Sequence, residues 1–173
     1  ETMVWSNFAN GRRGIVMGAI SGIDIALWDI AGKVAGLPLY RLLGANSDKV
    51  KGYASAGFYA PEKSIDDLKR EMGSYMAKGY TAFKMKVGRS RNNIGMPHRY
   101  VNKGDFNISF EEDMARVAAV RETIGQDAVL MIDMNCTWDV DAVLAAEKYF
   151  DEYNIYWIEE PSRSDDVAGY AKI

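Results

Sequence analysis

One stretch of the chain, residues 131–161 (MIDMNCTWDVDAVLAAEKYFDEYNIYWIEEP), restricts the fold more than any other part of the sequence. Its central segment, VDAVLAAEKYF, has apolar residues at helical spacing and separates two short apolar runs, so we expect strand, helix and strand. A helical crossover of this kind joins parallel strands. An acid closes each strand, Asp133 in the first and Glu159 in the second. Both acids therefore stand at the carboxyl ends of parallel strands, where α/β folds place their sites.

The alternation of side chains along a strand assigns the residues of both strands to two faces. On one face we expect Leu130, Ile132 and Met134 of the first strand and Tyr156, Ile158 and Glu160 of the second. On the opposite face we expect Asp133 and Asn135 together with Ile155, Trp157 and Glu159. The acids are thus predicted to share a face that the apolar core does not occupy.

The rest of the chain continues the alternation of helices and strands. We expect a long helix over Gly14 to Val34, a short one in LYRLLG, strands in VKGYASAGFY and YTAFKMKVG, and helices opened by capping boxes at Ser64 and Ser109. After Pro161 another helix begins. This order, a helix followed by repeated βα units, predicts a parallel sheet with helices outside it, either doubly wound or closed into a barrel.

The polar residues of the strands decide between these two architectures. Strands of a doubly wound sheet are covered on both faces and read as continuous apolar runs. Here successive strands carry apolar residues on one face and, on the other, Lys84, Lys86, Asp133, Asn135 and Glu159. A barrel accounts for this pattern, because the charged residues then gather inside its mouth. We therefore predict an α/β fold of the barrel type.

The composition narrows the class of protein further. The 173 residues are 48% hydrophobic and 26% charged, with a net charge of −3 that gives no reason to expect a nucleic acid or a membrane surface as partner. The sequence has no unbroken run of about 18 apolar residues and does not begin like a signal peptide. One cysteine, Cys136, excludes an internal disulfide and fits a reducing compartment. We expect a cytoplasmic protein.

Four ionisable residues, Lys84, Lys86, Asp133 and Glu159, are expected to point into one cavity. Such groups are costly to bury unless they pair with each other or bind a metal. Two interpretations follow: a catalytic or metal-binding site, or an internal network of salt bridges with a structural role. The four residues alone leave both open.

The chain resembles the mandelate racemase / muconate lactonizing enzyme group of the enolase superfamily. Four motifs in order carry the resemblance: SGIDIALWDIAGKVAGLPLYRLLG, FKMKVG, MIDMN and WIEEP, with the acids 159 − 133 = 26 residues apart. The resemblance implies that residues 1–47 are the C-terminal helices of an α+β capping domain. It implies that residues 48–173 are the first four βα units of a TIM-type barrel. On this interpretation the start of the capping domain and the second half of the barrel are absent from the chain.

The resemblance also implies roles for individual residues. Asp133 and Glu159 correspond to two of three carboxylate ligands of Mg²⁺, Lys86 to the base that removes a proton α to the substrate carboxylate, and Lys84 to a contact of that carboxylate. We expect the neighbouring ammonium and desolvation to lower the pKa of Lys86 toward that of a usable base. Asn135 would lie at the ligand shell or on substrate, and an ordinary structural asparagine is an equally open interpretation.

These roles imply a Mg²⁺-dependent acid-sugar dehydratase, or a racemase or epimerase, acting on a small carboxylate substrate. Dehydration and racemisation share their first step, so the sequence does not separate them. The alternative is a truncated, inactive fragment that self-associates through the open half-barrel. An open half-barrel exposes apolar surface, so we expect a homo-oligomer.

The segment from residue 89 to 110 is a long loop without periodicity, predicted to rise from the same end of the sheet as the site. It carries Arg89, Arg91, Arg99 and Lys103 against one acid, Asp105. A lid that offers cations to an acidic substrate and a loop with no such role are both open. The one histidine, His98, lies in this loop and matches no catalytic position of the family.

Overall fold

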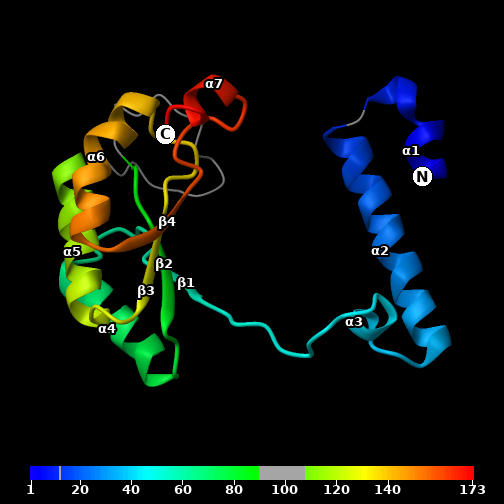
Figure 1. Ribbon diagram of the computed structural model, residues 1–173, viewed down its shortest axis with the longest axis horizontal. Helices are drawn as coiled ribbons and strands as arrows, with labels where there is room; N and C mark the ends of the chain where they lie inside the picture. Colours follow the sequence, from blue (N-terminus) through cyan, green and yellow to red (C-terminus); the bar gives the residue numbers. More distant parts are fainter. Residues whose placement is uncertain (12, 90–107) are drawn as a thin grey trace. The chain divides into compact units, whose positions relative to one another are not determined.

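A computed structural model describes residues 1–11, 13–89 and 108–173 of the chain (Figure 1). The chain divides into two compact units, Glu1–Lys51 and Gly52–Ile173. The domain boundary predicted from the sequence, between residues 47 and 48, falls just before this division. The two units are described separately.

The first unit is helical. Its elements are α1 (Thr2–Ser6), the 3-10 helix η1 (Phe8–Asn10), α2 (Ile15–Ala35) and α3 (Leu39–Leu42). Gly36 ends α2 in the left-handed conformation, with φ of 63°, and the N–H of Leu37 donates to the carbonyl of Gly32 at 3.0 Å. This closure is the usual one for a helix that ends at a glycine. The long helix predicted over Gly14 to Val34 is therefore confirmed.

By length and composition alone, α2 could cross a membrane, since it has 21 residues and a mean hydropathy of 1.5 over its most apolar window. Asp24 and Asp29 nevertheless interrupt its apolar sequence, so the helix is not an unbroken apolar run. One such helix is weak support for a membrane protein, because the core helix of a globular domain passes the same test. The assignment of α2 depends on the domain to which it belongs.

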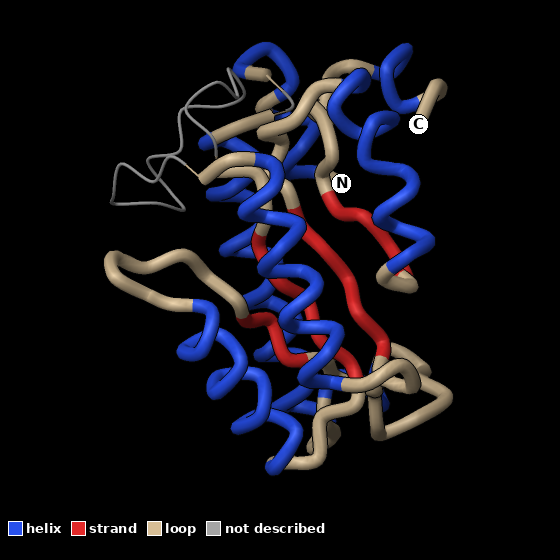
Figure 2. Tube along the Cα trace, turned by 90° about the vertical axis from the view of Figure 1, so that its left-hand side faces the viewer, coloured by secondary structure: helices blue, strands red, loops and turns tan. Residues whose placement is uncertain are grey.

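The second unit is built on a four-stranded parallel sheet in the order β1-β2-β3-β4. The strands are β1 (Ala54–Ala56), β2 (Ala82–Lys86), β3 (Val129–Asp133) and β4 (Ile155–Glu159); the helices are α4 (Ile65–Ala77), α5 (Phe110–Ile124), α6 (Val140–Glu152) and the short α7 (Val167–Tyr170). Helices α4, α5 and α6 lie on one side of the sheet (Figures 1 and 2). A doubly wound sheet would reverse its strand order and carry helices on both sides. The sheet is therefore the first part of a βα barrel, as predicted.

Side-chain caps fix where the helices of this unit begin. Ser64 accepts a hydrogen bond from the N–H of Asp67, whose side chain accepts from the N–H of Ser64, and Ser109 and Glu112 form the same reciprocal pair. Asp139 accepts from the N–H of Ala142 at the start of α6. Each cap satisfies N–H groups that a helix leaves unpaired at its N-terminus. Both predicted capping boxes are confirmed.

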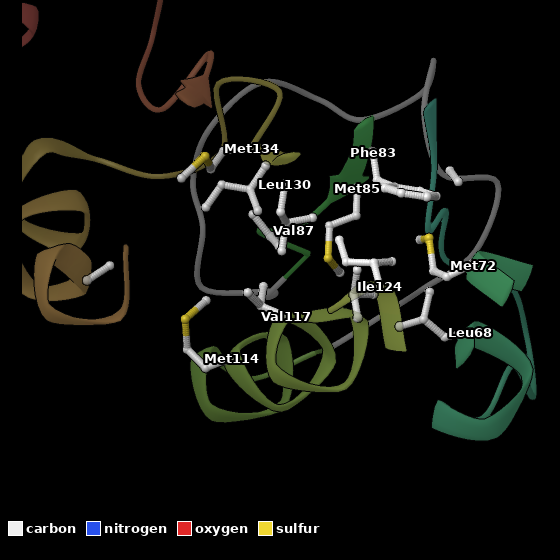
Figure 3. Close-up of a cluster of buried hydrophobic side chains, with 14 of the residues drawn as sticks. Leu68, Met72, Phe83, Met85, Val87, Met114, Val117, Ile124, Leu130 and Met134 are labelled. Atoms are coloured by element: carbon white, nitrogen blue, oxygen red, sulfur yellow. The ribbon is translucent and has the colours of Figure 1, made fainter. Parts of the chain in front are cut away.

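The core lies between the sheet and its helices (Figure 3). The strands contribute Phe83, Met85, Val87, Leu130, Ile132 and Met134, all with no exposed surface, and the helices contribute Leu68, Met72, Met114, Val117 and Ile124. Burial of a large apolar side chain stabilises a fold by about 1.5–3 kcal/mol. These residues alternate with Lys84, Lys86, Met131 and Asp133. Packing of the apolar residues against the helices therefore places the charged residues on the opposite face of the sheet.

The predicted faces of β4 are wrong for the first residue of the strand. Ile155 pairs with Leu130, but the next register pair joins Trp157 to Met131, so Tyr156 is an extra residue at a β-bulge. A bulge shifts the alternation by one residue. Ile155 therefore packs against the core together with Ile158, and Trp157 and Glu159 share the opposite face without it.

Arg121 in α5 is buried and ties together the amino-terminal ends of β3 and β4. None of the carboxylates in the described part of the chain pairs with it. Its guanidinium donates to four backbone carbonyls, those of Tyr153, Gly125, Ala128 and Asn154, at 2.7–2.9 Å. The side chain spans the turn before β3 and the turn before β4 with one rigid group. A lysine carries the same charge but lacks the planar fork of donors.

We expect Arg121→Lys to lower the free energy of unfolding by about 2–4 kcal/mol, since carbonyls buried around the guanidinium lose their donors. Urea unfolding of the complete polypeptide that carries this chain measures the change. Arg70→Lys is the control, because the side chain of Arg70 is 71% exposed. An Arg121→Lys protein as stable as the Arg70→Lys protein would contradict the structural role.

Candidate active site at the carboxyl ends of the strands

Three charged residues lie in one row across three strands. In the pairing register Lys86 of β2 lies opposite Asp133 of β3, and Asp133 lies opposite Glu159 of β4. All three are the last residues of their strands. Since neighbouring strands are about 4.8 Å apart, the row brings the two carboxylates and the ammonium to one place. Lys84 is two residues before Lys86 and therefore points to the same side.

Direct ion pairs connect these four residues. The ammonium of Lys86 donates a hydrogen bond to Oδ2 of Asp133. The ammonium of Lys84 lies 2.5 Å from Oε1 of Glu159 and 3.6 Å from Oδ2 of Asp133. Asp133 is 1% exposed, and the side chain of Glu159 is one-third exposed. The salt-bridge network considered as an alternative is thus present, and it is compatible with a catalytic site.

The surroundings of the four residues keep two of them charged. Burial alone would lower the pKa of Lys84, but the hydrogen bond and charge of Glu159, together with the charge of Asp133, raise it above its usual range. Burial alone would raise the pKa of Asp133, but the hydrogen bond of Lys86, the N–H of Asn135 and the charge of both lysines lower it. Lys84 is therefore a cation and Asp133 an anion at neutral pH.

Aromatic rings of the β1 segment flank the two lysines. The ammonium of Lys84 lies 5.4 Å from the ring centroid of Tyr53, and that of Lys86 lies 5.7 Å from the ring centroid of Phe58. Both distances are within reach of a cation–π interaction. Tyr53 also contacts Trp157 of β4 edge to face, at 6.0 Å between centroids. Sequence reasoning missed both rings, because β1 carries no charged residue that draws attention to it.

Asn135 follows Asp133 and lies at the edge of the site in a left-handed conformation, with φ of 50°. Its backbone N–H donates to Oδ1 of Asp133 at 2.9 Å, so the carboxylate keeps Oδ2 toward the lysines. Its side chain accepts from Arg89 at 2.8 Å and donates to Glu160 at 3.0 Å. The structure therefore places Asn135 beside Asp133, with both ends of its side-chain amide engaged.

Arg89 does not offer its charge to solvent, as a lid residue would. It is 3% exposed, and its guanidinium also donates to the carbonyls of Val87 and Met134, at the ends of β2 and β3. Of the two roles left open for this loop, that of a cationic lid does not fit Arg89, because its guanidinium is buried against backbone carbonyls at two strand ends. The other charged residues of that loop, Arg91, Arg99, Lys103, Asp105 and His98, lie outside the described residues.

A buried polar cluster behind the site was not predicted. Asp113 accepts hydrogen bonds from the hydroxyl of Tyr59 and from the N–H of Gly88, the latter at 2.7 Å. Arg116 forms an ion pair with Asp113 at 3.8 Å and lies 4.1 Å from the ring centroid of Tyr59. Burial raises the pKa of Asp113, and burial and the charge of Asp113 raise that of Tyr59. In sequence, Asp113 looks like an ordinary acid in the first turn of a helix.

The arrangement suits a hard cation only in part. Carboxylate oxygens are the ligands that Mg²⁺ prefers, and the ammonium of Lys84 already stands in as a cation between Glu159 and Asp133. Within residues 1–11, 13–89 and 108–173, however, no group of three acidic, histidine or cysteine side chains is placed to hold a metal. The described residues thus supply two candidate ligands, with two lysines beside them.

Curated relatives cover nearly all of this chain, while the chain spans about two fifths of their length. It is 36% identical to the 3,6-anhydro-alpha-L-galactonate cycloisomerase of Streptomyces coelicolor over 100% of the chain and 42% of the relative. It is 34% identical to the arabinonate dehydratase of Saccharolobus solfataricus over 90% and 37%. It is 33% identical to the L-talarate/galactarate dehydratase of Salmonella typhimurium over 99% and 38%. These relatives are dehydratases and cycloisomerases of sugar acids.

Solved structures share the fold. A racemase from Streptomyces coelicolor with bound magnesium superposes with a TM-score of 0.81 at 36% identity, covering 99% of this chain and 42% of that one. The L-talarate/galactarate dehydratase of Salmonella typhimurium, with Mg and L-lyxarohydroxamate, gives a TM-score of 0.79 at 33% identity, covering 99% and 39%. Both structures contain the metal that the resemblance implied.

Two family models match consecutive parts of the chain. Residues 2–44 match the N-terminal domain of mandelate racemase / muconate lactonizing enzyme, and residues 67–173 match the enolase C-terminal domain-like family. The first match includes α2, so this apolar helix is a helix of the N-terminal domain. The resemblance seen in the four motifs is confirmed, and the chain belongs to the mandelate racemase / muconate lactonizing enzyme group of the enolase superfamily.

Proposed function

We propose that this chain carries part of the active site of a Mg²⁺-dependent enzyme that removes the proton α to a substrate carboxylate. One observation supports the proposal above all: Lys86, Asp133 and Glu159 occupy one register row at the carboxyl ends of three parallel strands. In this proposal the row would hold a base beside two oxygen ligands for a hard cation.

Asp133 and Glu159 would hold Mg²⁺ in this proposal. The bound ion supplies positive charge to the substrate carboxylate, which makes the neighbouring proton more acidic. The ammonium of Lys84, which contacts both carboxylates, would give way to such a cation and become available to an anionic substrate. Its fixed position on β2 and its raised pKa suit it to bind the substrate carboxylate as a cation.

Lys86 would act as the base. It is 9% exposed, lies beside the ring of Phe58 and is anchored on the same strand as Lys84, so its amine has little freedom to move away from the site. To accept the α-proton Lys86 would have to be a neutral amine, so its ammonium, which donates to Asp133, would first release a proton to solvent. A second group that returns or transfers a proton is needed to complete a turnover, and the described residues do not supply it.

The substrate class follows from the relatives and remains a proposal for this chain. A dehydratase would eliminate the β-hydroxyl of a sugar acid after proton removal and give a 2-keto-3-deoxy acid. A racemase or epimerase would return a proton to the opposite face of the same carbon. Assembly as a homo-oligomer and a cytoplasmic location are further proposals, and the location rests on the composition.

The test uses the complete polypeptide that carries this chain, incubated in D₂O with Mg²⁺ and a panel of aldonic and aldaric acids. We expect one class of acids to gain deuterium at the α-carbon, and mass spectrometry of the product separates dehydration from inversion. A folded protein that binds Mg²⁺ and exchanges no acid would contradict the proposal and favour the inactive alternative.

We expect Lys86→Met to lower the rate of α-proton exchange by about 10²–10⁴-fold, the usual contribution of a general base, while a substrate analogue still binds. Isothermal calorimetry measures the binding and NMR the exchange. Circular dichroism is needed as a control, since Asp133 loses a buried partner. Exchange at the wild-type rate would remove Lys86 from the role of base.

Lys84→Met should behave differently, because a charge contact with the substrate carboxylate exists in both the ground state and the transition state. We expect KM to rise and kcat/KM to fall by about 10–100-fold, with analogue binding weakened in parallel. Steady-state kinetics on the same acid measures both constants. A fall in kcat with KM unchanged would assign Lys84 to the chemical step instead.

The metal-free protein should lose stability when acidified below a pH of about 4, the usual carboxyl pKa. The pKa of Asp133 is lowered in the fold, so its stabilising contribution is present above the unfolded-state pKa and is lost as pH falls through the folded one. Urea unfolding at several pH values should show a smaller acid-side slope in Asp133→Asn. Asp113, whose pKa is raised, contributes with the opposite sign in both proteins, so their difference isolates Asp133.

A further inference from the structure

Arg89 bridges the ends of β2 and β3 directly behind the row of charged residues. Gly88, with φ of 85°, turns the chain after β2, and a Cβ there would clash with Oγ1 of Thr137. The guanidinium of Arg89 donates through Nη2 to Oδ1 of Asn135 at 2.8 Å. On the other side of the same amide, Nδ2 donates to Oε2 of Glu160 at 3.0 Å.

The two partners of Asn135 determine how its amide is oriented. A guanidinium carries only donors, and an ionised carboxylate carries only acceptors. A flipped amide would turn its NH₂ group toward Arg89 and its oxygen toward Glu160, so both contacts would become repulsive. The assignment of oxygen and nitrogen therefore follows from the charges on both sides.

We propose that Arg89 is a positioning residue that holds the side chain of Asn135 as a hydrogen-bond donor to substrate and keeps its oxygen away from the metal. This inference deepens the proposed function and rests on it. The oxygen of Asn135 faces a positive charge, which opposes a divalent cation at the same atom. One N–H of the amide serves Glu160, and no described residue uses the second. That N–H is available for an oxygen of an acid-sugar substrate.

A buried cluster holds Arg89 in place. The ring centroid of Tyr59 lies 5.7 Å from the guanidinium of Arg89, and the hydroxyl of Tyr59 donates to Asp113. Asp113 also accepts from the N–H of Gly88, the residue before Arg89, at 2.7 Å. Arg116 donates to the carbonyl of Gly57 at 2.8 Å and so ties the β1 segment to the same cluster. The cluster thus fixes the backbone that carries Arg89.

The test is a double-mutant cycle in the complete polypeptide, with Arg89→Met, Asn135→Ala and both together. If Arg89 acts through Asn135, each single change should lower kcat/KM for α-proton exchange by about 10–100-fold, and the double change should lower it no further. Half-saturation with Mg²⁺ should stay within about twofold in Asn135→Ala, because no ligand is lost. Arg70→Met, on the exposed surface of α4, is the matched control. Additive losses, or a tenfold weaker response to Mg²⁺ in Asn135→Ala, would overturn the inference.

Asn135→Asp tests the role of the Asn135 amide even if the Arg89→Met protein does not fold. The aspartate keeps an oxygen toward Arg89 but places an acceptor where the donor was. The inference predicts a kcat/KM at least as low as that of Asn135→Ala and no gain in Mg²⁺ binding. A metal-ligand role predicts tighter Mg²⁺ binding instead, since a carboxylate replaces an amide. That result would overturn the inference.

Thermal unfolding of the wild-type protein, the two single variants Arg89→Met and Asn135→Ala, and the double variant separates this inference from the proposed function. If Arg89 and Asn135 act together, their substitutions change the unfolding midpoint non-additively, and this can be measured without substrate. If the wild-type protein exchanges no acid although the two residues are coupled, the proposed function fails and the positioning role falls with it. If the wild-type protein is active and the two residues show no coupling in either measurement, the inference alone is wrong.

Discussion

The pairing register of β2, β3 and β4 is the constraint on which the rest of the site depends. It places Lys86, Asp133 and Glu159 in one row, and a slip of one residue would turn every one of these side chains into the core. The register is held by the alternation itself, since Phe83 and Ile132 could not leave the helix side without exposing apolar surface. The apolar residues that stabilise the sheet therefore also determine the direction in which Lys86, Asp133 and Glu159 point.

The charges in turn must balance within a nearly dry space. Two ammonium groups and two carboxylates neutralise one another, which makes their burial affordable without a metal. A divalent cation between Asp133 and Glu159 would disturb this balance and leave the lysines in need of a new anion. The carboxylate of a substrate meets that need. Metal, substrate and lysines would thus complete one another in the proposed reaction.

Much of this could be predicted from the sequence, because the barrel architecture depends on patterns that are local. Helical spacing, capping boxes and the alternation in FKMKVG predict the helices and strands. The position of each acid at the end of a strand predicts where the candidate site lies. The face of Ile155 could not be predicted, because a β-bulge at Tyr156 depends on pairing with β3. The contacts of Arg89 and Asp113 could not be predicted for a similar reason: their partners are backbone groups and side chains distant in sequence, which no local pattern reveals.

The cluster behind the site shows how a barrel can give precision to residues that stand on loops. Asn135 is beyond the end of β3, where no strand pairing fixes its side chain, and its left-handed backbone is intrinsically unfavourable for a residue other than glycine. Arg89 offsets that cost by binding the amide and the carbonyl of Met134 together. Asp113 belongs to α5 and accepts a hydrogen bond from Gly88, the residue before Arg89. Helix α5 is thereby connected to the residues at the ends of the strands. The outer layer of the fold thereby contributes to the orientation of a group at its centre.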